Sequence, residues 1–114
     1  MLYTSYFAKQ KKNTQNKLYA ITSGKPSFFE GEWLECVAPE WIIVSEYKKG
    51  IISEDVYESR YIAFLNLNKE KILKVLKDLP DESILLCYEG PGKFCHRHVL
   101  AKWLRKNKIE IEEF

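Results

Sequence analysis

A nearly continuous apolar run stands at residues 83–88, in the C-terminal third of the chain. Its four central positions, Ile-Leu-Leu-Cys, leave no polar face, which is typical of a strand covered on both sides. Turn-forming residues bound the run, with a Pro-Asp-Glu segment before it and the glycine-containing segment 89–94 after it. The pattern therefore predicts a central strand that leads into a loop.

Apolar residues at helical spacing mark four helices. Pro39 suits the first turn of a short helix that ends at Gly50. Ser53 and Asn68 are placed to cap the next two helices, the second of which carries lysines on its outer face. The last helix is expected over residues 95–105, and its packed side consists of Val99, Leu100, Trp103 and Leu104.

Three further segments read as strands. Residues 2–7 are rich in aromatic and hydroxyl side chains, residues 18–22 form a short apolar stretch, and Ile109 and Ile111 alternate with glutamates at an edge strand. Residues 28–37 show neither period, so a loop is expected there. Strands separated by helices favour a three-layer α/β fold, with a small parallel or mixed sheet flanked by helices.

Composition indicates one packed unit. A chain of 114 residues, 46% of them hydrophobic and only 5 of them glycine, suits a single domain spanning residues 1–114. The net charge of +2 is far from the basic excess of a dedicated nucleic-acid-binding protein. Nucleic acid is therefore only a secondary expectation as a partner.

The compartment follows from the N-terminus and the cysteines. Residues 1–7 lack the basic and apolar regions of a signal peptide, and no run approaches the roughly 18 apolar residues of a membrane span. Cys36, Cys87 and Cys95 are an odd number of cysteines, which suits reduced thiols better than a disulfide framework. These features predict a cytoplasmic protein with no membrane partner.

The strand, loop and helix start between residues 83 and 104 form the most promising site. The first N–H groups of a helix lack internal partners, and the helix dipole favours negative charge there. Cys95 is expected at this helix start with His96 and Arg97 beside it, an environment that favours a thiolate. Arg97 is the expected anchor for an anion, since its planar fork can hold a phosphate or carboxylate at two points.

Each of these residues also has a plainer interpretation. Cys87 fits a small core residue, His96 fits a group that hydrogen-bonds loop carbonyls, and Arg97 fits a solvated side chain. Glu89, at the carboxyl end of the central strand, stands where open α/β sheets bind ligands, yet it could simply pair with a loop lysine. Ser5 could sit beside it if the first strand is adjacent.

The spacing argues against a metal site. Cys87 and Cys95 are too far apart in sequence for the usual gap between zinc ligands, and His96 and His98 diverge on a helix. The Gly-Pro-Gly-Lys loop is not followed by Ser or Thr, so it is not a nucleotide-hydrolase phosphate loop. No motif in the sequence identifies a cofactor.

The segment LLCYEGPGKFCHRHVLAKWL at residues 85–104 resembles the signature of the family called domain of unknown function 488. Compact members of bacteria and phages also begin with a segment similar to residues 3–7 and contain a stretch similar to residues 34–61. The resemblance implies functional positions at Cys87, Glu89, Cys95, His96 and Arg97, with a looser match at Ser5. It implies no particular reaction.

The sequence is compatible with three functional hypotheses. The first is an enzyme or binding domain for an anionic, nucleotide-like ligand, in which Cys95, His96 and Glu89 are catalytic and Arg97, Cys87 and Ser5 contact the ligand. The second is a non-catalytic interaction or nucleic-acid-binding protein that uses the basic loop 9–17 and the aromatic residues Phe28, Phe29 and Trp33. The third is thiol redox chemistry between Cys87 and Cys95.

Overall fold

A computed structural model describes all residues from Met1 to Phe114. Its centre is a five-stranded sheet in which every pair of neighbouring strands is parallel, in the order β3-β2-β4-β1-β5. The strands are β1 (Leu2–Tyr6), β2 (Leu18–Ala20), β3 (Glu32–Trp33), β4 (Ile84–Cys87) and β5 (Ile111–Glu113). The apolar run predicted as the central strand is β4, and the predicted edge strand is β5.

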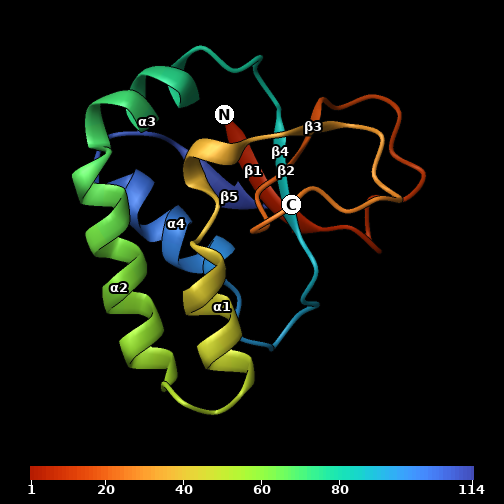
Figure 1. Cartoon of the computed structure of the whole chain (residues 1–114). Coiled ribbons are helices and arrows are strands. Elements are labelled where there is room, and N and C mark those ends of the chain that lie inside the picture. The colour runs from red at the N-terminus through yellow and green to blue at the C-terminus, as the bar shows by residue number, and fades with distance from the viewer.

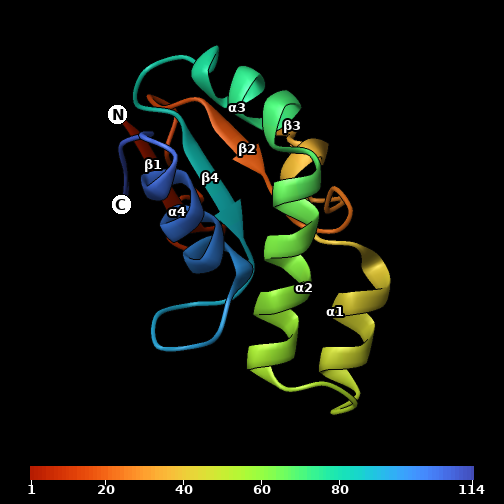
Figure 2. The ribbon, with the colours of Figure 1, turned by 90° about the vertical axis from the view of Figure 1, so that its left-hand side faces the viewer.

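The helices all pack on one face of this sheet, and the loops 7–17 and 21–31 cover the other face (Figures 1 and 2). Both helical connections, from β3 to β4 and from β4 to β5, cross the sheet in the same direction, so right-handed crossovers place their helices on the same side. The elements are a 3-10 turn η1 (Glu35–Val37) and helices α1 (Trp41–Lys48), α2 (Glu54–Leu67), α3 (Lys69–Lys77) and α4 (His96–Lys106). The predicted α/β fold is confirmed, and loops form the layer on its second face.

Alternation along the strands divides the buried residues between the two faces. Leu85 and Cys87 belong to the main hydrophobic cluster beneath the helices, whereas Ile84 and Leu86 are buried outside that cluster. Tyr6 is the register partner of Cys87 on the neighbouring strand, so its side chain points to the helical face as well. The carboxyl ends of β1 and β4 therefore direct Tyr6 and Cys87 toward the helical face, where α4 begins.

A side-chain cap marks the start of one of the four helices. Ser53 caps α2, because its side-chain oxygen accepts a hydrogen bond of 3.2 Å from the amide of Val56. Asn68 precedes α3 as expected, but its side chain donates to the carbonyl of Phe64 at 2.9 Å and does not cap the new helix. Cys95 is the N-cap residue of α4, one position before the helix proper.

The loop expected over residues 28–37 is wrong for its second half, which contains β3 and η1. Only two residues pair in β3, too few for an alternating pattern to show in the sequence. The pairing with β2 is continued by Leu34, whose amide donates to the carbonyl of Ala20 at 2.8 Å. Long-range pairing, rather than local periodicity, fixes this segment.

None of the helices has the length and apolar character needed to cross a membrane.

Candidate functional site

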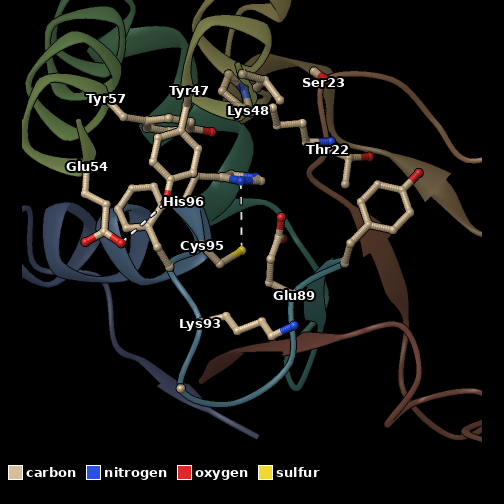
Figure 3. Close-up of a pocket in the computed structure, with 15 residues that line it drawn as sticks. Thr22, Ser23, Tyr47, Lys48, Glu54, Tyr57, Glu89, Lys93, Cys95 and His96 are labelled. Atoms are coloured by element: carbon tan, nitrogen blue, oxygen red, sulfur yellow. Dashed lines mark hydrogen bonds between the residues drawn. The ribbon is translucent and has the colours of Figure 1, made fainter. Parts of the chain in front are cut away.

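A cleft of about 440 Å³ lies at the carboxyl end of the sheet, between the β4–α4 loop and helices α1 and α2 (Figure 3). This is the edge at which open α/β sheets bind their ligands. The strand ends contribute Thr22, Ser23, Tyr88 and Glu89, and the helix start contributes Phe94, Cys95 and His96. The remaining lining residues are Pro39, Val44, Tyr47, Lys48, Glu54, Tyr57, Gly92 and Lys93.

Cys95 and His96 meet at the floor of this cleft. The Sγ atom of Cys95 lies 4.0 Å from Nδ1 of His96 (Figure 3). Nε2 of the same ring lies 2.6 Å from the carbonyl oxygen of Ile21. A carbonyl oxygen only accepts, so Nε2 must carry the proton and donate it to Ile21. Nδ1 is then an acceptor that faces the sulfur of Cys95, which is where a base would stand next to a thiol if Cys95 were reduced.

Burial keeps the imidazole of His96 neutral. Desolvation is the main cause that lowers its pKa from the ordinary 6.5 to about 4, and the positive charges of Arg97 and His98 add to this effect. The hydrogen bond to Ile21 acts in the opposite direction and is outweighed. His96 therefore presents an unprotonated Nδ1 throughout the neutral pH range.

Glu89 brings a carboxylate to the two cysteines. The carboxylate of Glu89 and the sulfurs of Cys87 and Cys95 all lie within 4.8 Å of one another. Glu89 is only partly buried and lines the cleft, so its carboxylate is accessible to a bound molecule. The structure thus brings together Cys87, Glu89, Cys95 and His96 from the positions singled out in the sequence.

Cys87 and Cys95 form a disulfide, and Cys36 is a free thiol. The expectation of three reduced thiols is therefore wrong for this pair. The end of β4 and the N-cap of α4 converge on one point at the helical face of the sheet, which brings together two cysteines separated by eight residues. Their Cα atoms are 7.5 Å apart, beyond the range of about 4.4–6.8 Å that is usual for protein disulfides, so this backbone also accommodates two separate thiols.

Arg97 does not line the cleft. Its side chain is fully buried at 0% exposure, and its Nε donates to both carboxylate oxygens of Glu113 at 3.2 Å. Nη2 lies 3.1 Å from Oε2 of Glu113, in a geometry that makes an ion pair without a well-aligned hydrogen bond. The guanidinium is thus held by groups of the protein itself. Arg97 is not among the residues that line the cleft, where it was expected to bind an anion.

The remaining guanidinium nitrogen reaches the disulfide. Nη1 of Arg97 donates to Sγ of Cys87 at 3.0 Å and to the backbone oxygen of Glu89 at 2.5 Å. The guanidinium also lies over the ring of Tyr6, 5.5 Å from its centroid. Arg97 therefore links the end of β1, the β4–α4 loop and one sulfur of the disulfide.

Ser5 lies on the opposite face of the sheet from the cleft. Its side chain is fully buried, and its hydroxyl accepts a hydrogen bond of 3.1 Å from Nε2 of Gln10 in the covering loop. The preceding residue, Thr4, faces the helices and donates to Glu113 at 2.6 Å. Alternation along β1 therefore separates Ser5 from Cys95 and His96.

An aromatic wall lines the cleft, and the sequence reasoning did not assign it to the site. Tyr47, Tyr57 and Phe94 pack against one another with ring centroids 5.0 to 5.4 Å apart. Burial raises the pKa of Tyr57 well above its ordinary range, and burial and the nearby Glu54 raise the pKa of Tyr47. Both hydroxyls are therefore neutral donors. In the sequence both tyrosines stand at helical spacing with other apolar residues, a pattern that by itself indicates only a packed helix face.

Three possible metal ligands stand together although the sequence spacing argued against a metal site. Cys87, Glu89 and Cys95 would supply two sulfurs and one oxygen once the disulfide is reduced. A structural zinc site takes four ligands, and the guanidinium of Arg97 already places positive charge beside Cys87. The expectation that the site holds no metal stays a prediction.

The residues of the interaction hypothesis lie elsewhere. Lys11 and Lys12 are exposed in the loop after β1, and Phe28 is exposed while packing on Phe7 with ring centroids 5.4 Å apart. Trp33 is anchored through its indole nitrogen, which donates to the carbonyl of Thr22 at 2.9 Å. None of these lysines and aromatic residues lines the cleft.

Comparison with known families decides the relationship. The family model described as the active DUF488-N3 subclade matches residues 7–108. The chain belongs to the DUF488 family. The match covers the strand, loop and helix that carry Cys87, Glu89, Cys95, His96 and Arg97, so the resemblance seen in the sequence is confirmed. No curated protein and no solved structure matches this DUF488 chain.

Proposed function

We propose that the cleft is the active site of an enzyme that uses the reduced thiol of Cys95 as a nucleophile toward a small anionic molecule. The observation that carries this proposal is the pairing of Cys95 Sγ with Nδ1 of His96, 4.0 Å away, on a ring whose other nitrogen is fixed by Ile21. A nucleophile, a base and a group that orients the base are the three parts of an activated-cysteine site. The matched subclade is described as active, which agrees with a catalytic role.

The chemistry assigns a role to each group. His96 Nδ1 takes the thiol proton as the sulfur bonds to an electrophilic atom of the ligand, and the resulting imidazolium returns that proton to the leaving group. Glu89, which lines the cleft, then takes a proton from a water molecule whose oxygen attacks the covalent intermediate, and the bond to Cys95 breaks with its electron pair returning to the sulfur. The reaction class is group transfer or hydrolysis through a cysteine-bound intermediate.

The cleft lining indicates the kind of ligand. Tyr47, Tyr57 and Phe94 offer an apolar wall for a planar ring, and Lys48 and Lys93 supply positive charge at the rim. These lysines, rather than Arg97, become the proposed contacts for an anionic group. A ligand that combines a ring with a phosphate or carboxylate, such as a nucleotide, fits both features.

The disulfide favours a second candidate function, thiol–disulfide exchange between Cys87 and Cys95. The two functions are compatible because the first requires the pair to be reduced. In the cytoplasm, which the sequence predicts as the compartment, low-molecular-weight thiols keep most cysteines reduced. The oxidised pair would then be a reversible state of the same cleft.

Ligand binding is tested on the reduced protein with inorganic phosphate, nucleotides, nucleosides and their uncharged analogues as probes. We expect at least one ring-bearing anion to shift the NMR signals of Tyr47, Tyr57 and Cys95, and to bind roughly tenfold more weakly when Lys48 and Lys93 are replaced by alanine. Lys74→Ala, on the exposed face of α3, is the matched control and should leave the affinity unchanged.

Turnover is tested with the same molecules. A ligand that is converted by the wild-type protein, but not by Cys95→Ser, would support the nucleophile role. Signals that stay unchanged at the cleft for every probe, or turnover that survives Cys95→Ser, would contradict the proposal.

A further inference from the structure

The two sulfurs of the disulfide have different surroundings. Cys95 lines the cleft, although only 3% of the residue is exposed, whereas Cys87 is fully buried and is not part of the lining. Only Cys87 receives a hydrogen bond from the guanidinium of Arg97, at 3.0 Å. One sulfur thus faces incoming molecules, and the other faces a buried positive charge.

We propose that a low-molecular-weight thiol opens this disulfide in one direction, by attack on Cys95 with Cys87 as the leaving group. This inference rests on thiol–disulfide exchange, the second proposed function, and adds to it the attacked sulfur, the leaving sulfur and the residue that stabilises the latter. It needs neither the base His96 nor the anionic ligand of the first function.

The step balances with one named co-reactant. The thiolate of the small molecule attacks Sγ of Cys95, a sulfur–sulfur bond forms between them, and the bond from Cys95 to Cys87 breaks with its electron pair moving to Cys87. The protein then carries a mixed disulfide at Cys95 and a thiolate at Cys87. A second thiol attacks the mixed disulfide, releases the small-molecule disulfide and leaves both cysteines reduced.

Arg97 stabilises the leaving group. A leaving thiolate departs faster when its negative charge is stabilised, and a hydrogen bond from a guanidinium is of the charge-assisted, stronger kind. Arg97 is already in place, because Glu113 and the backbone oxygen of Glu89 hold its other donors. No rearrangement of the guanidinium is needed as charge develops on Cys87.

The direction of opening is read from the site of the adduct. The oxidised wild-type protein is mixed with 2-mercaptoethanol, quenched with acid at short times, alkylated and digested, and the peptides of Cys87 and Cys95 are measured by mass spectrometry. We expect the mercaptoethanol adduct on Cys95 and the alkyl group on Cys87, in at least roughly tenfold excess over the reverse pattern. An adduct mainly on Cys87, or equal amounts on both, would overturn the direction.

Failure of the exchange function looks different in the same experiment. A disulfide that stays closed under millimolar thiol gives neither adduct nor alkylated cysteine, which contradicts both exchange and its direction. Adduct on the wrong sulfur contradicts only the direction. The wild-type mapping needs no substitution, so a variant that does not fold cannot obscure the result.

The role of Arg97 is tested by the rate of opening. Arg97→Met should slow the appearance of the Cys95 adduct by roughly tenfold, as expected for the loss of a charge-assisted hydrogen bond to the leaving sulfur. Glu113→Gln is the matched control, because it removes the charge partner of Arg97 but leaves the donor at Cys87 in place. Equal rates for Arg97→Met and wild type would remove Arg97 from the step.

Discussion

Nη1 of Arg97 donates a hydrogen bond to Sγ of Cys87 at 3.0 Å, across a separation of ten residues in the chain. The same side chain pairs with Glu113 on the edge strand β5, so a single buried guanidinium connects the C-terminal strand to the candidate site. A buried charge requires such partners, because an isolated ion in a low-dielectric interior is strongly unfavourable. The fold and the site therefore depend on the same residue.

Removing the carboxylate of Glu113 should destabilise the protein more than is usual for a side chain that is 40% exposed. Glu113→Ala leaves the fully buried guanidinium without its ion pair, so we expect the free energy of unfolding to fall by about 2–4 kcal/mol. Denaturant unfolding of the variant measures this loss. Glu112→Ala, on the neighbouring exposed position, is the control, and an equal effect of both variants would contradict the assignment.

Stability should fall in mild acid because of His96. Its pKa is about 4 in the folded protein against an ordinary 6.5, so the unfolded chain binds a proton at a pH where the folded protein does not. The stabilisation is complete above pH 6.5 and is lost as the pH falls toward 4, by about 3 kcal/mol in total.

Unfolding free energies measured between pH 7 and pH 4 test this dependence. His96→Gln should flatten the slope, because its amide can still donate to Ile21 but has no titrating group. A slope that is the same in the variant and in the wild type would rule out His96 as its source.

Gly31 should tolerate no side chain. A Cβ atom there would meet the ring of Phe29 and would lie 2.8 Å from the backbone oxygen of Leu18, which cannot move without disturbing β2. We expect Gly31→Ala to cost about 1–3 kcal/mol of stability, in line with other overpacking substitutions. Gly24→Ala is the matched control, since a Cβ atom there meets nothing within 4 Å and the change should stay within about 0.5 kcal/mol. Equal melting temperatures for the two variants would contradict this reading.

The N-cap of α2 should contribute measurably to stability. Ser53→Ala removes the acceptor for the amide of Val56 and should cost about 1 kcal/mol, whereas Ser53→Asp keeps an acceptor and should cost little. Thermal unfolding of the two variants checks the difference. If Ser53→Asp lost as much as Ser53→Ala, the hydrogen bond would not be the cause.

The helices and the central strand could be predicted because their signals are local. Ser53 marks a helix start through its own side chain, and the apolar run of β4 follows from burial on both faces. The two-residue strand β3 could not be predicted, because its partner β2 is supplied by the fold. The placement of all helices on one face depends on strand order, which local patterns do not contain.

The candidate site could likewise be predicted only in part. The proximity of Cys95 and His96 follows from their adjacency at a helix start, and the sequence indicated both. The contact of Cys87 with Cys95 and the burial of Arg97 against Glu113 depend on how β4, α4 and β5 meet in space. The aromatic wall was missed for a related reason, since a tyrosine at helical spacing looks the same whether it fills a core or lines a cleft.

The assignment of Cys95 as a nucleophile activated by His96 is tested most directly by the reactivity of the reduced cysteines. After complete reduction, the protein is treated with iodoacetamide between pH 6 and pH 8, and alkylation of Cys36, Cys87 and Cys95 is followed by peptide mapping. We predict that Cys95 reacts at least roughly tenfold faster than Cys36, a half-buried thiol whose pKa is raised by burial. His96→Gln should remove this advantage, and His98→Gln should not. Fastest alkylation at Cys87 or Cys36, or an unchanged rate at Cys95 in His96→Gln, would contradict it.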